Sequence, residues 1–175
     1  FGQSVNVDEA VTRGLEAAPR FPLAQGWVAS LNYTYTESEQ KSGASAGKPL
    51  GDTPEHALNA RLSWEISPSW NSWLRAEYRS ERYRDPGSSA ATRAARDALG
   101  DYKGYAMVHL GSSYRLSKSV TLNAAVYNLL NKDFVDYRPY QAPGSATPTW
   151  SSVYVNNMDG RRLGLAVGAG FLGQP

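Results

Sequence analysis

Apolar and polar residues alternate with a period of two in segment after segment of this 175-residue chain. The alternation is clearest near the end, where Leu163, Leu165 and Val167 are separated by glycine or alanine. Successive side chains of a strand point to opposite faces of a sheet, so the pattern predicts strands with one apolar face. About seven such strands are predicted, near residues 4–17, 27–36, 57–66, 70–81, 105–114, 120–127 and 162–171.

The predicted connections between these strands differ in length in a regular way. Short connections alternate with long ones along the chain, and turn residues such as proline and glycine occur in both kinds. Outer-membrane β-barrels have short turns on the periplasmic side and long loops outside, whereas a soluble sandwich has no reason to segregate loops by length. The short connections are residues 18–25, 67–69 and 116–118, and the long ones are 39–53, 84–101 and 136–157.

Aromatic residues mark both ends of the predicted strands. Trp27, Trp70 and Tyr114 lie beside the short connections, and Tyr35 and Tyr78 lie beside the long ones. Two aromatic girdles are expected where the strand ends of a barrel meet the lipid interfaces. Tyr and Trp are also good strand formers, but this does not explain why they occur at both ends.

The other face of the predicted strands is polar and partly charged. An arginine facing lipid at the midplane costs about 2–4 kcal/mol, whereas an arginine in a wet lumen costs little. A soluble lipocalin-like barrel would have the opposite arrangement, with an apolar interior and a charged exterior. Alternation alone does not distinguish this barrel from a membrane barrel, but the aromatic girdles and the loop lengths favour the membrane barrel. The polar face carries Asn32, Thr34, Arg61, Glu65, Arg75, Glu77, Arg79, Glu81 and Asn123.

Composition excludes several other classes of protein. The net charge of +2 is too small for a nucleic-acid binder, and the lack of cysteine excludes disulfides and thiolate metal sites. The sequence contains no run of about 18 apolar residues, so no transmembrane helix is predicted. His56 and His109 are far apart in the sequence and lack paired ligands, and no nucleophile elbow or phosphate-binding glycine loop occurs. We therefore expect no enzyme activity, no cofactor and no metal site.

Bacterial single-chain barrels normally have an even number of strands, and a sheet of seven strands would be an open slab with two unpaired edges. Each unsatisfied backbone group in hydrocarbon costs several kcal/mol, so an open slab of seven strands is not expected to be stable in a membrane. The sequence begins at Phe1 without a signal peptide, and the strand count makes it begin in the middle of a barrel. The residues alone leave three alternatives: part of a larger barrel, a small or oligomeric outer-membrane barrel serving as a pore or binding protein, and a soluble β domain.

Five stretches taken together are specific enough to suggest a family. The first precedes Pro22, Leu23 and Trp27, and the fourth has the form V-x-N-L-x-(D/N)-K-x-(F/Y). They are VTRGLE at residues 11–16, LNYTYTE at 31–37, DTPEHALNARLSW at 52–64, VYNLLNKDF at 126–134 and GRRLGLAVGAGF at 160–171. In these stretches the chain resembles TonB-dependent outer-membrane receptors, most of all ferric-siderophore receptors of the catecholate and colicin I receptor type.

The resemblance covers nearly the whole chain and implies a fold and a function. It implies that residues 1–171 are the C-terminal part of an antiparallel transmembrane β-barrel of about 22 strands in the outer membrane of a Gram-negative cell. An upstream plug would contact the TonB complex, lipid and lipopolysaccharide would surround the barrel, and the barrel-assembly machinery would read its last aromatic. Residues 172–175 are a tail beyond Phe171, where family members usually stop. The expected activity is uptake of ferric siderophores.

Cations and aromatic rings concentrate in the predicted outer loops. An anionic ferric catecholate would favour this mixture of positive charge and ring faces. The alternative is that these are ordinary loop charges, neutralised by Asp85, Asp97 and Asp101 or by lipopolysaccharide. The candidate ligand-binding residues are Arg79, Arg82, Tyr83, Arg84, Tyr102, Lys103, Tyr137, Arg138 and Tyr140.

Overall fold

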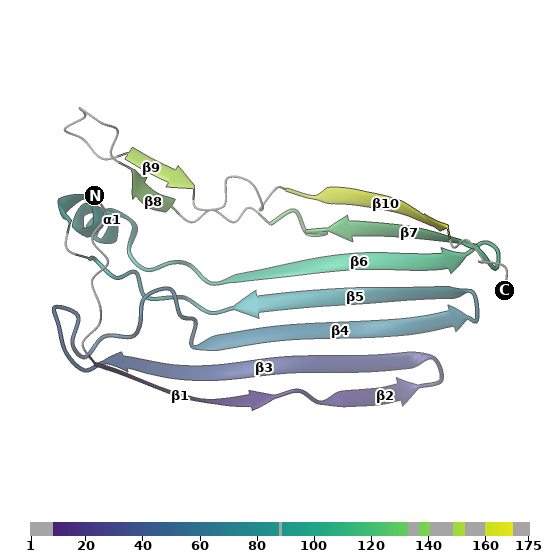
Figure 1. The fold of residues 1–175 in the computed structure, drawn as a ribbon, viewed down its shortest axis with the longest axis horizontal. Helices are drawn as coiled ribbons and strands as arrows, with labels where there is room; N and C mark the ends of the chain where they lie inside the picture. The colour runs from purple at the N-terminus through teal and green to yellow at the C-terminus, as the bar shows by residue number, and fades with distance from the viewer. Residues whose placement is uncertain (1–8, 88, 133–136, 141–148, 153–159, 170–175) are drawn as a thin grey trace, which may run out of the picture.

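The computed structural model describes residues 9–87, 89–132, 137–140, 149–152 and 160–169. Most of these residues form one antiparallel sheet in which strands adjacent in sequence lie side by side (Figure 1). The strands of this sheet are β1 (Ala10–Ala17), β2 (Arg20–Ala24), β3 (Trp27–Gln40), β4 (His56–Ser67), β5 (Trp70–Arg79), β6 (Tyr105–Arg115), β7 (Val120–Tyr127) and β10 (Arg162–Ala169).

Strands β1 and β2 lie end to end along β3, so the sheet is seven strands wide, as predicted. The expectation of a short turn over residues 18–25 is wrong, because Arg20–Ala24 is a strand and the chain turns at Gly26, whose φ is 77°. The ladder even continues across the interruption, since Leu31 N–H donates to the Pro19 carbonyl (3.0 Å). Proline is tolerated here because β1 and β2 form an edge of the sheet.

The register of the strands carries the alternation across the whole sheet. One row on the apolar face runs from β4 to β10 through Leu62, Leu74, Leu110, Val126 and Leu163. A one-residue slip in any pair would move a strand's apolar side chains to the polar face. The apolar face is therefore continuous only because every pair is in this register.

The apolar face is not covered by a second layer in the described part of the chain. Ala95 and Met107 are the buried apolar residues there, whereas Leu165 and Val167 are 86% and 70% exposed. A soluble β domain would bury these side chains in a dry interior. The exposed apolar face is what the membrane-barrel interpretation predicts.

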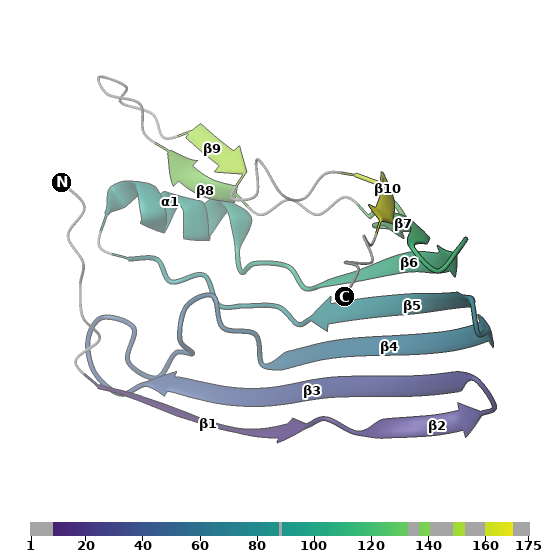
Figure 2. The ribbon, with the colours of Figure 1, turned by 45° about the vertical axis from the view of Figure 1, so that its right-hand side comes forward.

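Loop lengths separate the two ends of the sheet as predicted. Short turns connect β2 to β3, β4 to β5 and β6 to β7 at one end, and the long connections gather at the other (Figure 1). The long connection between β5 and β6 holds a helix that the sequence analysis missed, α1 (Ala90–Leu99). A small hairpin of β8 (Tyr137–Tyr140) and β9 (Thr149–Ser152) lies beside this helix (Figure 2).

The signals for α1 are present in the sequence. The Ser89 hydroxyl accepts a hydrogen bond from Thr92 N–H (3.1 Å) at its start, and Gly100 ends it with φ of 66°. An alanine-rich run between such caps predicts a helix. No helix in the described ranges is long and apolar enough to span a membrane.

Candidate functional site

Aromatic side chains pair across the strands at the short-turn end of the sheet. Trp27 stacks on Trp64 across the strands with ring centroids 4.7 Å apart, and Trp70 meets Tyr114 edge to face at 6.4 Å. All four side chains lie on the apolar face at the short-turn end, as the predicted aromatic girdle requires. Trp64 was not among the residues predicted for this girdle. Because outer-membrane barrels have short turns on the periplasmic side, the long connections form the outer end, where a ligand from outside would arrive.

Two buried arginines enclose Tyr102 at this outer end. Arg82 and Tyr102 exchange two backbone hydrogen bonds of 2.9 Å, which joins the two ends of the β5–β6 connection. The Arg84 guanidinium lies 3.7 Å from the Tyr102 ring centroid and that of Arg82 lies 5.2 Å from it. The two arginines are only 5% and 7% exposed, so both cation–π contacts are shielded from water.

Both arginines also have partners other than the ring. Arg82 Nη1 lies 2.6 Å from Asp52 Oδ1, and Arg84 Nε donates to the Gly100 carbonyl (2.8 Å). Asp101 accepts from the Arg84 backbone N–H and forms an ion pair with Arg96. These contacts stabilise the loops, and Asp52 is a partner that sequence reasoning did not find.

The first two long connections are joined to each other. Gln40, a buried side chain at the end of β3, donates to the Pro49 carbonyl (2.8 Å) and lies 3.4 Å from Asp85 Oδ2. Asp52 N–H donates to the Tyr83 carbonyl (3.0 Å), and the Tyr83 ring lies 4.9 Å from the Arg96 guanidinium. Residues 41–55, 80–87 and 89–104 therefore form one tied unit.

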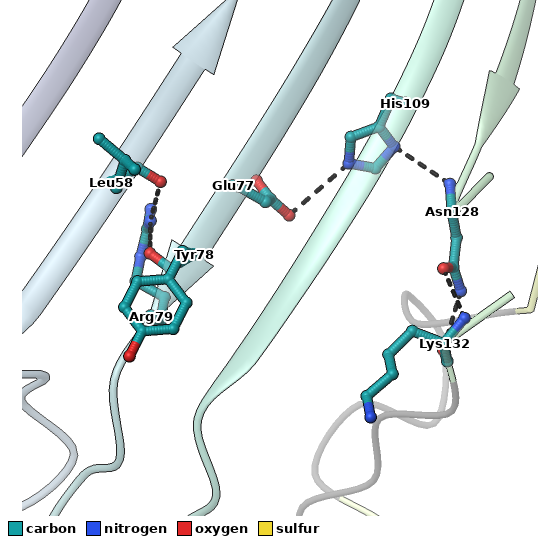
Figure 3. A network of polar contacts seen from close by, with 7 residues as sticks. All are labelled: Leu58, Glu77, Tyr78, Arg79, His109, Asn128 and Lys132. Atoms are coloured by element: carbon teal, nitrogen blue, oxygen red, sulfur yellow. Dashed lines mark hydrogen bonds and ion pairs between the residues drawn. The ribbon is translucent and has the colours of Figure 1, made fainter. Parts of the chain in front are cut away.

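The remaining candidate residues lie in three different settings. Arg79 is half-buried at the end of β5 and donates to the carbonyls of Leu58 (3.3 Å) and Tyr78 (2.8 Å) (Figure 3). Lys103 is exposed next to Tyr102. The last three candidates belong to β8, whose backbone pairs with β9 and whose side chains lie outside what the structure describes; they are Tyr137, Arg138 and Tyr140.

A pocket of about 250 Å³ opens near this unit but has the wrong charge for an anion. Three of its lining residues are glutamates, which favour a cation over a ferric catecholate. No group of three or more His, Asp or Glu in the described ranges is arranged to hold a metal ion. The lining is Tyr35, Thr36, Glu37, Ser38, Pro49, Thr53, Glu55, Glu81 and Tyr83.

Below the loops, the polar face carries a hydrogen-bonded group centred on His109. Its Nδ1 accepts from Asn128 N–H (3.1 Å), and its Nε2 lies 3.8 Å from Glu77 Oε1 (Figure 3). The Asn128 side chain donates to the Lys132 carbonyl and accepts from Lys132 N–H, both at 2.9 Å. Sequence reasoning gave these residues no role, although Asn128 is the asparagine of the VYNLLNKDF stretch.

A family model described as TonB dependent receptor-like, beta-barrel, matches residues 2–129. The chain belongs to the TonB-dependent receptor β-barrel family. Members of this family are outer-membrane transporters and not enzymes, so the expected fold, location and lack of enzymatic activity are confirmed. The chain is accordingly a segment of an outer-membrane β-barrel.

Individual TonB-dependent receptors show how far the similarity extends. Over 78% of this chain, the sequence is 38% identical to the iron-regulated outer membrane virulence protein of Vibrio cholerae. Over 95% of this chain, it is 32% identical to the ferric enterobactin receptor of Pseudomonas aeruginosa. These alignments cover 20% and 22% of the two relatives, so the chain spans about one fifth of their length.

Solved structures agree on the fold. A structure of the P. aeruginosa ferric enterobactin receptor superposes with a TM-score of 0.69 at 28% identity, covering 94% of this chain and 23% of that one. Another structure of that receptor is a complex with enterobactin. A copper transporter also superposes, with a TM-score of 0.64 over 93% of this chain and 24% of its own, but at 18% identity. The fold alone therefore does not decide the cargo.

Proposed function

We propose that this chain is the C-terminal barrel part of a receptor that takes up ferric siderophores, and that the cargo is an anionic ferric catecholate. The V. cholerae relative is iron-regulated by its name, and the P. aeruginosa relative is a ferric enterobactin receptor. The likeness to the latter extends over 95% of this chain, including the outer connections.

The observation that carries the proposal is the cationic and aromatic character of the tied outer loops. Arg82 and Arg84 enclose Tyr102 and are held by Asp52 and the Gly100 carbonyl, so the loop that carries the exposed Lys103 is ordered. A cation on an ordered loop attracts an anion at a lower entropic cost than a cation on a loop that orders only on binding.

The nine candidate residues divide into two roles in this proposal. The buried or tied residues, Arg82, Tyr83, Arg84 and Tyr102, position the loops. The others would touch the ligand: Arg79, Lys103, Tyr137, Arg138 and Tyr140.

The parts of the relatives beyond this chain would supply the rest of the transport cycle. A plug domain would close the barrel and contact the TonB complex, which supplies the energy for uptake. Outer-membrane lipid and lipopolysaccharide would surround the apolar face, and the barrel-assembly machinery would insert the protein.

Binding to the full-length receptor tests the proposal. Lys103→Ala and Arg138→Ala should each weaken binding of a ferric catecholate by about fivefold, the roughly 1 kcal/mol of an exposed charge interaction. Lys118→Ala is the matched control for Lys103→Ala, because Lys118 is also exposed but lies in the short turn between β6 and β7. Quenching of tryptophan fluorescence measures ligand binding, and accumulation of radioactive iron in cells measures uptake.

Two results would contradict the proposal. Unchanged binding and iron uptake in both Lys103→Ala and Arg138→Ala would contradict the site assignment. Tight binding of copper ions, with no binding of ferric catecholates, would remove the siderophore assignment while leaving the fold intact.

A further inference from the structure

Asn128 has a backbone conformation that few residues adopt. It directly follows β7, its φ is 50°, and it is 5% exposed. Asparagine enters this left-handed region more readily than most residues other than glycine. Its side chain then makes two hydrogen bonds to the backbone of Lys132, which closes a tight turn at the start of the β7–β10 connection.

His109 anchors this turn to the neighbouring strand β6. Its Nδ1 accepts the Asn128 N–H, so in neutral His109 the proton sits on Nε2, on the side of Glu77 (Figure 3). One residue on, Leu129 N–H donates to the Val108 carbonyl at 2.7 Å. Two consecutive backbone N–H groups of the turn are thus held by β6.

The far end of the same connection returns to this turn. Asn131 Oδ1 accepts from Arg161 N–H (2.9 Å), and Arg161 Nε donates to the Leu129 carbonyl (3.0 Å). Residues 128–132 and 161, which we call the neck, therefore hold both ends of a connection that includes β8.

We propose that His109 and Asn128 are positioning residues that hold the neck and thereby set the position of β8, the strand to which the proposed function assigns three ligand contacts. This inference rests on the proposed function, because only that function makes β8 part of a binding site. Neither residue touches the ligand; both act through the backbone of the connection.

Protonation of His109 changes this arrangement in a defined way. Imidazolium carries a proton on both nitrogens, so Nδ1 no longer accepts the Asn128 N–H. The charged and titratable groups around the ring are Arg75 and Glu77 on β5, Tyr127 on β7 and Arg162 on β10. Glu77 would hold the imidazolium while the neck loses its anchor.

Hydrogen exchange in the full-length receptor tests the neck separately from binding. The variants are His109→Ala, which removes the acceptor, and Asn128→Gly, which keeps the left-handed backbone but removes the side-chain bonds. Asn123→Ala is the control, because this asparagine lies on the polar face of β7, outside the neck, and is exposed. Heat-modifiable migration on gels verifies that each variant forms a barrel.

Both neck variants should speed amide exchange in peptides covering β8 and weaken ferric catecholate binding. His109→Ala should do so by about tenfold, as for one lost buried hydrogen bond, and Asn128→Gly, which loses two, by at least as much. His109→Asn should restore both, since an amide oxygen replaces Nδ1 as acceptor. Lowering the pH to about 4.5, two units below the ordinary pKa of histidine, should reduce the protection factors of the β8 peptides, which correct for the slower intrinsic exchange at low pH, in the unmodified receptor but not in His109→Asn.

Three outcomes decide between the claims. Exchange in His109→Ala equal to that in Asn123→Ala would show that His109 does not hold the neck. The same loss of protection at low pH in His109→Asn as in the unmodified receptor would show that protonation of the His109 ring is not its cause. Faster exchange with unchanged affinity would leave the neck intact but contradict its role in binding, and with it the placement of the ligand site at β8.

Discussion

Replacing Leu74 by arginine tests which face of the sheet meets lipid. Leu74 lies midway along β5 between Trp70 and Tyr78, which mark the two girdles on the same face. Eight residue steps of about 3.4 Å give about 27 Å between these rings along the strand. A strand tilt of about 40° reduces this to about 21 Å along the membrane normal, close to the apolar band of about 25 Å.

Leu74 therefore lies near the midplane, where an arginine facing lipid costs about 2–4 kcal/mol. Leu74→Arg should lower the free energy of unfolding of the full-length receptor by this amount, measured by urea unfolding in phosphatidylcholine vesicles. Asn123→Arg adds the same charge on the polar face and should change it by less than about 1 kcal/mol. A larger loss for Asn123→Arg than for Leu74→Arg would show that the two faces are inverted.

Two further substitutions test packing on the polar face and in the loops. Gly111→Ala should cost about 1–3 kcal/mol in the same unfolding assay, because a Cβ there would overlap the Trp73 ring, whereas Gly168→Ala, with its nearest neighbour 3.8 Å away, should be nearly neutral. Arg84→Met keeps the alkyl stem but loses the guanidinium stacked on Tyr102. It should lower the opening free energy of α1 by about 1–3 kcal/mol in hydrogen exchange, and unchanged protection would show that the ring contact does not hold the loop.

The candidate site was predictable in its composition but not in its roles. The sequence places arginines and tyrosines in the outer loops, and the structure brings Arg82, Arg84 and Tyr102 together there. It does not reveal that both arginines are buried, because burial depends on Asp52 and α1, which come from different parts of the chain. Charge in a loop sequence therefore does not distinguish a cation that meets a ligand from one that holds the loop.

The sequence by itself determined seven strands of the large sheet, their two faces and the separation of short turns from long connections, because a period of two is a local property of the backbone. It did not determine β2, since Pro19 and Pro22 signal a turn unless the strand lies at an edge. Pairings between distant residues were decided by tertiary structure alone. Arg61 faces Arg75 across β4 and β5, and His109 accepts the Asn128 N–H, only because the register of neighbouring strands brings them together. Register is a relation between segments, and no single segment encodes it.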